Sequence, residues 1–119
     1  MFADFYIQTK FEAAPRLVVA AGADIILPEQ SAETAYILES GKAVCPTTGH
    51  VFAPGMILSL VEFLAYEHYL NPVRAKTDCR LITCQRDELK NLMSSENSLT
   101  WPLSCQLAAD VVNRREQGA

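Results

Sequence analysis

Few side chains in this sequence have the types and spacing that catalysis or metal binding requires. The two histidines, His50 and His68, lie far apart, and neither belongs to the H-x-H pattern that holds a metal in some β-barrel enzymes. The hydroxyls of Ser59, Thr100 and Ser104 have no histidine–acid partner in their sequence context. We therefore predict no metal site and no catalytic residues, and we expect that the protein is not an enzyme.

The four cysteines are the remaining candidates for metal or redox chemistry. They are scattered along the chain, and no two form the C-x-x-C pair that is typical of zinc sites: Cys45, Cys79, Cys84 and Cys105. We interpret them as reduced thiols packed in apolar or mixed surroundings, which is the usual state of cysteine in a cytoplasmic protein.

Length and charge limit the possible functions. The chain has 119 residues, which fits one domain spanning 1–119. With 10 basic and 14 acidic side chains its net charge is −4, so it has no general attraction for the phosphates of DNA or RNA. No segment reaches the roughly 20 apolar residues of a membrane span, and the first residues lack the basic region of a signal peptide. We expect a cytoplasmic protein that binds neither nucleic acid nor membrane.

Turn signals cut the region 16–85 into short β-prone runs. The first five are RLVVAA, DIILP, TAYIL, KAVC and HVFA, and VRAKTDCRLITC adds two more around a turn at Thr77 and Asp78. Crossover helices need about a dozen residues each, and the gaps between the runs are too short for them. The pattern predicts a mainly β fold, a barrel or sandwich, over residues 16–85.

Apolar residues at helical spacing flank the predicted barrel. Residues 1–14 are expected to form a short amphipathic helix that Pro15 ends, and residues 58–70 a helical turn or short helix. Residues 86–116 are expected to form two helices separated by the SSENS stretch. The second helix should start between Ser98 and Trp101, because Pro102 is tolerated only in a first turn.

Three longer motifs resemble a known family, the cyclic-nucleotide-binding domains. AETAYILESGKAVC is similar to the family's hairpin, APGMIL to its turn before the ligand loop, and VRAKTDCRLITCQRDELKNLM to its closing strands and following helix. The resemblance extends from about Leu17 to Arg115 and is strongest with effector domains of the catabolite-activator and fumarate-nitrate-regulator group. It implies a jelly-roll barrel, a double-stranded β-helix, followed by a long helix that forms a homodimer.

The ligand-binding motif of that family is altered in this sequence. The family's phosphate-binding loop carries a glycine and a ribose-binding glutamate, and these positions fall on Ser59 and Leu60, followed by Val61. Its R-[ST]-A motif, whose arginine pairs with the cyclic phosphate, falls on Tyr69, Leu70 and Asn71. Glu62 lies two residues past the glutamate position, and no single shift of register restores both glutamate and arginine. The resemblance thus predicts a degenerate site at these positions and no ordinary binding of cyclic AMP or cyclic GMP, because a buried phosphate without a countercharge is costly.

The last helix is expected to carry two further features. Trp101, Leu103, Leu107 and Val111 have the spacing of a helix stripe and would form the dimer interface. Arg114 and Arg115 lie where the family's helix approaches the ligand, and they are candidates for supplying positive charge to the site. The alternative is that they form a solvated helix terminus. The regulators of this group continue into a helix-turn-helix, which we expect to be lacking here.

These observations leave several hypotheses for function. The first is a non-enzymatic regulatory or sensor domain for signal transduction, with a degenerate phosphate-binding loop, that binds a different small ligand or a protein partner and needs no cofactor. The second is a true cyclic-nucleotide sensor with a rewired site, and the third is a small barrel enzyme acting on an apolar substrate.

Three aromatic residues three apart, Phe63, Tyr66 and Tyr69, either cap the barrel or form a pocket for a flat ligand. We favour the cap, because apolar stripes at helical spacing are usually core.

Overall fold

The strands in the described part of the chain form two antiparallel sheets. The computed structural model describes residues 14–96 and 100–118, so nearly all of the helix predicted over residues 1–14 lies outside the described part. The first sheet has the strand order β1-β7-β3, with β1 at Arg16–Val19, β7 at Cys79–Gln85 and β3 at Thr34–Ser40. Because β7 pairs with both neighbours, this sheet joins the beginning of the chain to its last strand.

The second sheet consists of four short strands. Its order is β2-β6-β4-β5, and the strands are β2 (Asp24–Ile26), β6 (Val73–Ala75), β4 (Ala43–Val44) and β5 (Val51–Phe52). Each strand of both sheets overlaps one of the runs predicted from the sequence, with β3 and β7 extending two and one residues beyond theirs. The prediction of a mainly β, jelly-roll fold is therefore confirmed.

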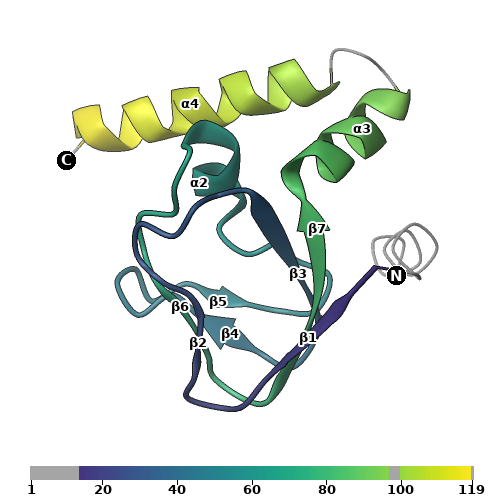
Figure 1. The fold of residues 1–119 in the computed structure, drawn as a ribbon. Helices are drawn as coiled ribbons and strands as arrows, with labels where there is room; N and C mark the ends of the chain where they lie inside the picture. The colour runs from purple at the N-terminus through teal and green to yellow at the C-terminus, as the bar shows by residue number, and fades with distance from the viewer. Residues whose placement is uncertain (1–13, 97–99, 119) are drawn as a thin grey trace.

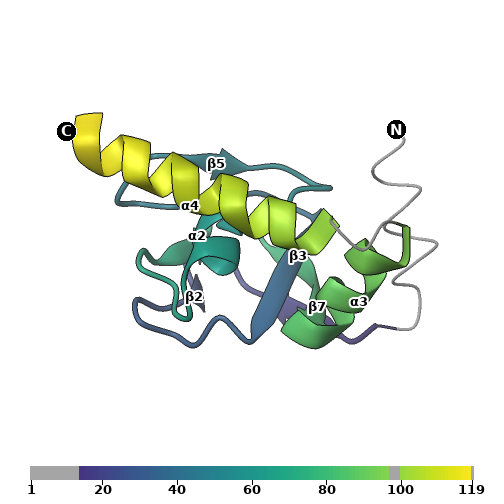
Figure 2. The ribbon, with the colours of Figure 1, turned by 90° about the horizontal axis from the view of Figure 1, so that it is seen from above.

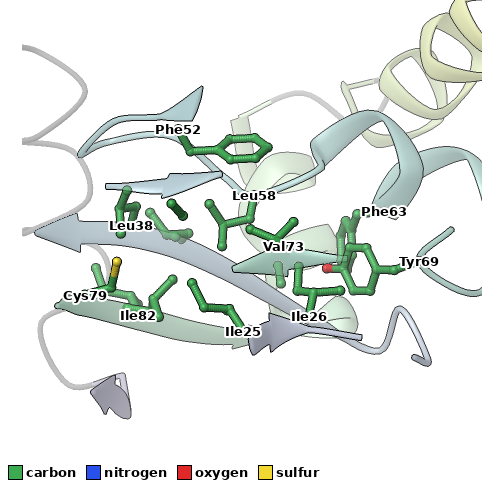
Figure 3. Packing of buried hydrophobic residues seen from close by; sticks show 14 of the residues in the cluster. Ile25, Ile26, Leu38, Phe52, Leu58, Phe63, Tyr69, Val73, Cys79 and Ile82 are labelled. Atoms are coloured by element: carbon green, nitrogen blue, oxygen red, sulfur yellow. The ribbon is translucent and has the colours of Figure 1, made fainter. Parts of the chain in front are cut away.

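The core lies between the two sheets and consists of aliphatic and aromatic side chains together with three cysteines (Figure 3). Strand β7 illustrates how the sequence produces it: Cys79 and Leu81 point inward and are buried, while Arg80 between them is exposed. The largest side chains with less than 2% exposure are Tyr69, Phe63, Ile26, Ile37, Leu38, Leu58, Leu81 and Ile82. Phe63 and Tyr69 are both fully buried in the core, which agrees with the prediction that these rings are packed rather than open to a ligand.

The turn between β3 and β4 requires glycine. Gly41 has a φ of +92°, and a Cβ atom at this position would lie 2.2 Å from the backbone oxygen of Asp78. The turn therefore packs directly against the Thr77–Asp78 turn, where the Thr77 hydroxyl accepts a hydrogen bond from the Lys42 amide at 2.9 Å. A side chain at residue 41 would separate the two turns and the strands that they connect.

Three described helices lie at one end of the sheets (Figure 1). They are α2 (Leu60–Ala65), α3 (Arg86–Glu96) and α4 (Thr100–Gly118). Helix α4 runs across α2 in both views, and the two elements are in contact (Figures 1 and 2). These positions agree with the predicted short helix and the two later ones. Among the helices of the described ranges, none has the length and apolar character needed to cross a membrane.

The cysteines occupy core or partly covered positions. Cys45, Cys79 and Cys84 are buried, Cys105 is half-buried, and all four are free thiols, as the sequence predicted. Burial, and then the nearby Glu88 carboxylate, raises the pKa of the Cys84 thiol to about 11. This thiol therefore stays protonated at neutral pH, as expected for a packing residue.

Candidate functional site

A partly open hollow lies between the β4–β5 hairpin and the segment that leads into α2. It has a volume of about 830 Å³, within the usual range of small-molecule sites. Its walls come from three parts of the chain. The lining residues are Cys45, Thr48, Gly49, His50 and Phe52 of the hairpin, Met56, Ile57, Ser59, Leu60, Val61 and Glu62 of the segment, and Asn71 ahead of β6.

The hairpin wall of the hollow is held by local contacts. The Cys45 amide donates to the His50 carbonyl at 2.9 Å, and the Gly49 amide donates back to the Cys45 carbonyl at 2.8 Å. The edge of the His50 ring packs on Phe52, with 4.6 Å between the ring centroids. Phe52 is buried, so the imidazole lies at the boundary between the apolar wall and solvent.

The opposite wall follows the Pro54–Gly55 turn. The Leu38 amide donates to the Met56 carbonyl at 2.9 Å, and the Leu58 amide donates to the Tyr36 carbonyl at 2.8 Å, so this segment pairs with β3. The pairing directs Leu58 into the core, whereas its neighbours Ile57 and Ser59 line the hollow. The turn predicted from the sequence thus places residues 57 to 62 along one side of the site.

Ser59 adopts a backbone conformation that is normally taken by glycine. It precedes α2 with φ 49° and ψ 46°, in the left-handed region. The resemblance places the family's loop glycine at this position. A serine thus adopts a left-handed backbone at the position of that glycine, and its carbonyl accepts the Phe63 amide at 3.0 Å.

The principal charged group of the hollow is Glu62. Its side chain is only 9% exposed, and its Oε1 accepts a hydrogen bond from the Asn71 Nδ2 atom at 2.9 Å. This bond ties the first turn of α2 to the segment before β6. No lysine or arginine occurs among the lining residues that the structure describes.

Two arginines of the described chain that do not line the hollow have partners elsewhere. Arg74 is exposed on β6 and pairs with Asp24 at 3.3 Å. Arg86, at the start of α3, lies at the other end of α2. Its guanidinium donates to the carbonyls of Ala32 at 3.0 Å, Tyr66 at 3.2 Å and Phe63, and it covers the Phe63 ring at 4.4 Å.

The structure brings together part of the predicted site. Ser59, Leu60, Val61 and Asn71 all line the hollow. Leu70 is half exposed and is not part of the lining. The side chains of Arg114 and Arg115 lie outside the described part of the structure.

Tyr69 is a predicted site residue that does not line the hollow. It is fully buried, and its hydroxyl donates to the Thr34 carbonyl at 2.9 Å. Its ring stacks on Phe63 with 6.3 Å between centroids (Figure 3). Burial raises the pKa of this hydroxyl above its ordinary value, with the nearby Tyr36 acting in the same direction. The position that the resemblance assigns to the phosphate-binding arginine is thus part of the core.

The residues proposed for a dimer interface divide between two environments. Leu103 and Leu107 are 57% and 65% exposed, and Val111 is half-buried. Trp101 instead packs against the core, with its ring 5.6 Å from the Arg86 guanidinium. The leucines leave an apolar stripe on α4, and Trp101 belongs to the contact between α4 and the rest of the domain.

Sequence reasoning missed the hairpin wall and the role of Glu62. From the sequence, His50 is a candidate only for metal binding, and Glu62 lies two residues past the family's glutamate position. The available signal was the spacing in LVEFL: a carboxylate inside an apolar run is expensive to bury without a partner. Its partner Asn71 follows the short helix by only a few residues.

Comparisons with known proteins support the fold. No protein-family model matches the sequence, and no curated protein matches it. A transcriptional regulator from Thermotoga maritima is 14% identical over 92% of this chain and 93% of that chain, with a TM-score of 0.68. A cyclic nucleotide-binding-like protein from Brucella abortus is 25% identical over 72% and 81% of the two chains, with a TM-score of 0.54.

A third structure extends the comparison to a ligand complex. PKAR CBD2 with Sp-2Cl-cAMPS bound is 17% identical over 92% of this chain and 75% of that chain, with a TM-score of 0.68. The chain therefore has the fold of cyclic-nucleotide-binding domains, as the resemblance of its motifs predicted.

Proposed function

We propose that this protein is a non-enzymatic regulatory domain of the cytoplasm that senses a small ligand in the hollow beside α2. The observation that carries the proposal is the hollow itself. It lies against the loop that the resemblance assigns to ligand binding, and it combines apolar walls with a buried carboxylate.

The ligand proposed here is not cyclic AMP or cyclic GMP. Leu60 stands at the position of the ribose-binding glutamate, and Tyr69, at the arginine position, is buried in the core. The described lining offers a phosphate no lysine or arginine, and it places the Glu62 carboxylate in the same hollow. A cyclic phosphate there would meet like charge without a counterion.

Thermal-shift and calorimetric measurements with cyclic AMP and cyclic GMP test this proposal. We expect no change in melting temperature and no heat of binding at micromolar to millimolar nucleotide, because ligand binding stabilises the folded state only when affinity is sufficient. A clear shift at micromolar nucleotide would overturn it in favour of a rewired cyclic-nucleotide sensor.

We also propose that two copies associate through α4. Leu103 and Leu107 are large apolar side chains on the exposed side of this helix, and a second copy would cover them. Sedimentation of the Leu107→Asp variant tests the interface: we expect a fall from dimer to monomer mass. Asn91→Asp adds a negative charge at an exposed position of α3 and should leave the mass unchanged. An unchanged mass for Leu107→Asp would show that this helix is not the interface.

A further inference from the structure

The chemistry of the hollow also indicates what kind of ligand it takes. We propose that the hollow binds a cationic molecule with an amine group on an apolar body, and that Glu62 and Asn71 together hold the ammonium. This inference rests on the proposed function, since it assumes that the hollow is a small-ligand site.

The hydrogen bond between Glu62 and Asn71 fixes which side chain donates and which accepts. An ionised carboxylate can only accept hydrogen bonds, so the Asn71 amide must turn its NH₂ group toward Glu62, as the 2.9 Å contact from Nδ2 to Oε1 shows. The same orientation leaves the amide oxygen of Asn71 available as an acceptor. The second carboxylate oxygen of Glu62 is another acceptor. Among the side chains that the structure describes, neither of these two oxygens has a further hydrogen-bond partner.

Two neighbouring acceptors, one of them anionic, match a group with several donors. An ammonium carries three N–H donors and a positive charge, so it can bond to both oxygens and neutralise Glu62 at once. A carboxylate or phosphate would instead be repelled by the negative charge of Glu62, which is only 9% exposed. The net charge of the whole chain, −4, likewise attracts a cationic ligand and repels an anionic one.

The rest of the lining suits an apolar ligand body. Phe52, Ile57 and Val61 line the walls, and the 38% exposed Met56 and 37% exposed Leu60 add further apolar surface. At about 830 Å³ the space exceeds that of an ammonium group alone and accommodates an aromatic or branched aliphatic portion. The donor group would be fixed at the Glu62–Asn71 pair while the body displaces water from the walls.

A simpler role for the pair is a purely structural tie between α2 and residue 71. The two roles differ in what the negative charge does. A structural tie needs only a hydrogen bond, which a glutamine at position 62 can make through its side-chain oxygen. Recognition of a cation needs the charge itself. The Glu62→Gln variant therefore separates the two roles.

Matched probes that share one apolar body provide the test: phenethylamine, phenethyl alcohol and 3-phenylpropionate, added at millimolar concentration and followed by amide chemical shifts. We expect the amine to shift the resonances of residues 57–62 and 71, the alcohol to bind more weakly, and the carboxylate to leave them unchanged. Glu62→Gln should weaken amine binding by about tenfold or more, as loss of a charge-assisted hydrogen bond predicts, while its unfolding transition stays close to that of the wild type.

Glu67→Gln removes an exposed acid outside the hollow and serves as the matched control, which should bind the amine as the wild type does. Carboxylate binding equal to that of the amine, or unchanged amine binding by Glu62→Gln, would overturn the charge assignment and leave the proposed function standing. If none of the probes shifts the resonances of the hollow, both the assignment and the small-ligand function are wrong.

Discussion

The two ends of α2 hold two poorly exposed charged groups in opposite ways. At the C-terminal end, the Arg86 guanidinium donates to three backbone carbonyls and lies over the rings of Phe63 and Trp101. At the N-terminal end, the Glu62 side chain has one described hydrogen bond, from Asn71. Arg86 has most of its donors occupied by its own protein, whereas Glu62 keeps acceptor capacity directed at a hollow.

This difference distinguishes a structural charge from a functional one. Burying a charge is costly unless hydrogen bonds compensate, so a charge whose partners are all internal indicates a role in stability. A charge with one internal partner and an open side indicates a role in recognition. The region also illustrates why counting charges is insufficient: an arginine lies within the contact range of α2, but at the end away from the hollow.

The largest expected effect is at the Arg86 end. Arg86→Met should lower the free energy of unfolding by about 2–4 kcal/mol, because the carbonyls of Ala32, Phe63 and Tyr66 lose a charged donor while remaining in place. Urea denaturation measures this change. The matched control is Arg80→Met on β7: Arg80 is half exposed and pairs with Glu39 at 2.8 Å, and its loss should cost less than about 1 kcal/mol. Equal effects for the two variants would remove the structural role assigned to Arg86.

An intermediate effect is expected for the aromatic pair beside Arg86. Tyr69→Phe keeps the ring stacked on Phe63 but deprives the Thr34 carbonyl of its donor, and it should cost about 1–2 kcal/mol. Tyr66→Phe, at a half-buried position of the same segment, should cost less than about 0.5 kcal/mol. Chemical denaturation of both variants checks the order. If Tyr69→Phe lowers the free energy of unfolding no more than Tyr66→Phe does, the Tyr69 hydroxyl contributes little to stability.

The smallest effect is expected at the hollow end. Ser59→Gly should change stability by less than about 1 kcal/mol, with any change favouring the variant, because glycine adopts the observed left-handed backbone without strain. Ser40→Gly, at the end of β3, lacks that relief and should destabilise by about 0.5–1 kcal/mol. Differential scanning calorimetry of the two variants provides the comparison. Destabilisation of Ser59→Gly to the same extent would show that the serine side chain contributes to this loop.

The sequence predicted the strands and helices well because their signals are local. Short runs of β-branched and aromatic residues ended by glycine or proline mark strands, and the position of Pro102 limits where the last helix begins. The candidate site was predicted less completely. Ser59, Leu60, Val61 and Asn71 were identified because they follow a recognisable turn or align with a family motif, and all four line the hollow.

What failed was the direction of individual side chains. Tyr69 aligns with a ligand-binding position, yet its amide donates to the Gln30 carbonyl at 2.8 Å and its carbonyl accepts the Glu29 amide at 2.7 Å. This pairing with a distant segment accompanies a fully buried ring. Likewise, Arg86 was assigned only to a helix start, because its partners are backbone carbonyls, and carbonyls carry no signature in a sequence.

Signals within short segments of the sequence predict the mainly β, jelly-roll fold, the Pro54–Gly55 turn, and a leucine and a tyrosine where the resembling family has glutamate and arginine. These depend on residue type and on spacing within short segments. The folded chain adds what the sequence does not predict: the hollow, the Glu62–Asn71 pair in its lining, and the hydrogen bonds of Arg86 at the opposite end of α2. Those outcomes depend on which segments, distant in the chain, meet in space and on which way each side chain points when they do.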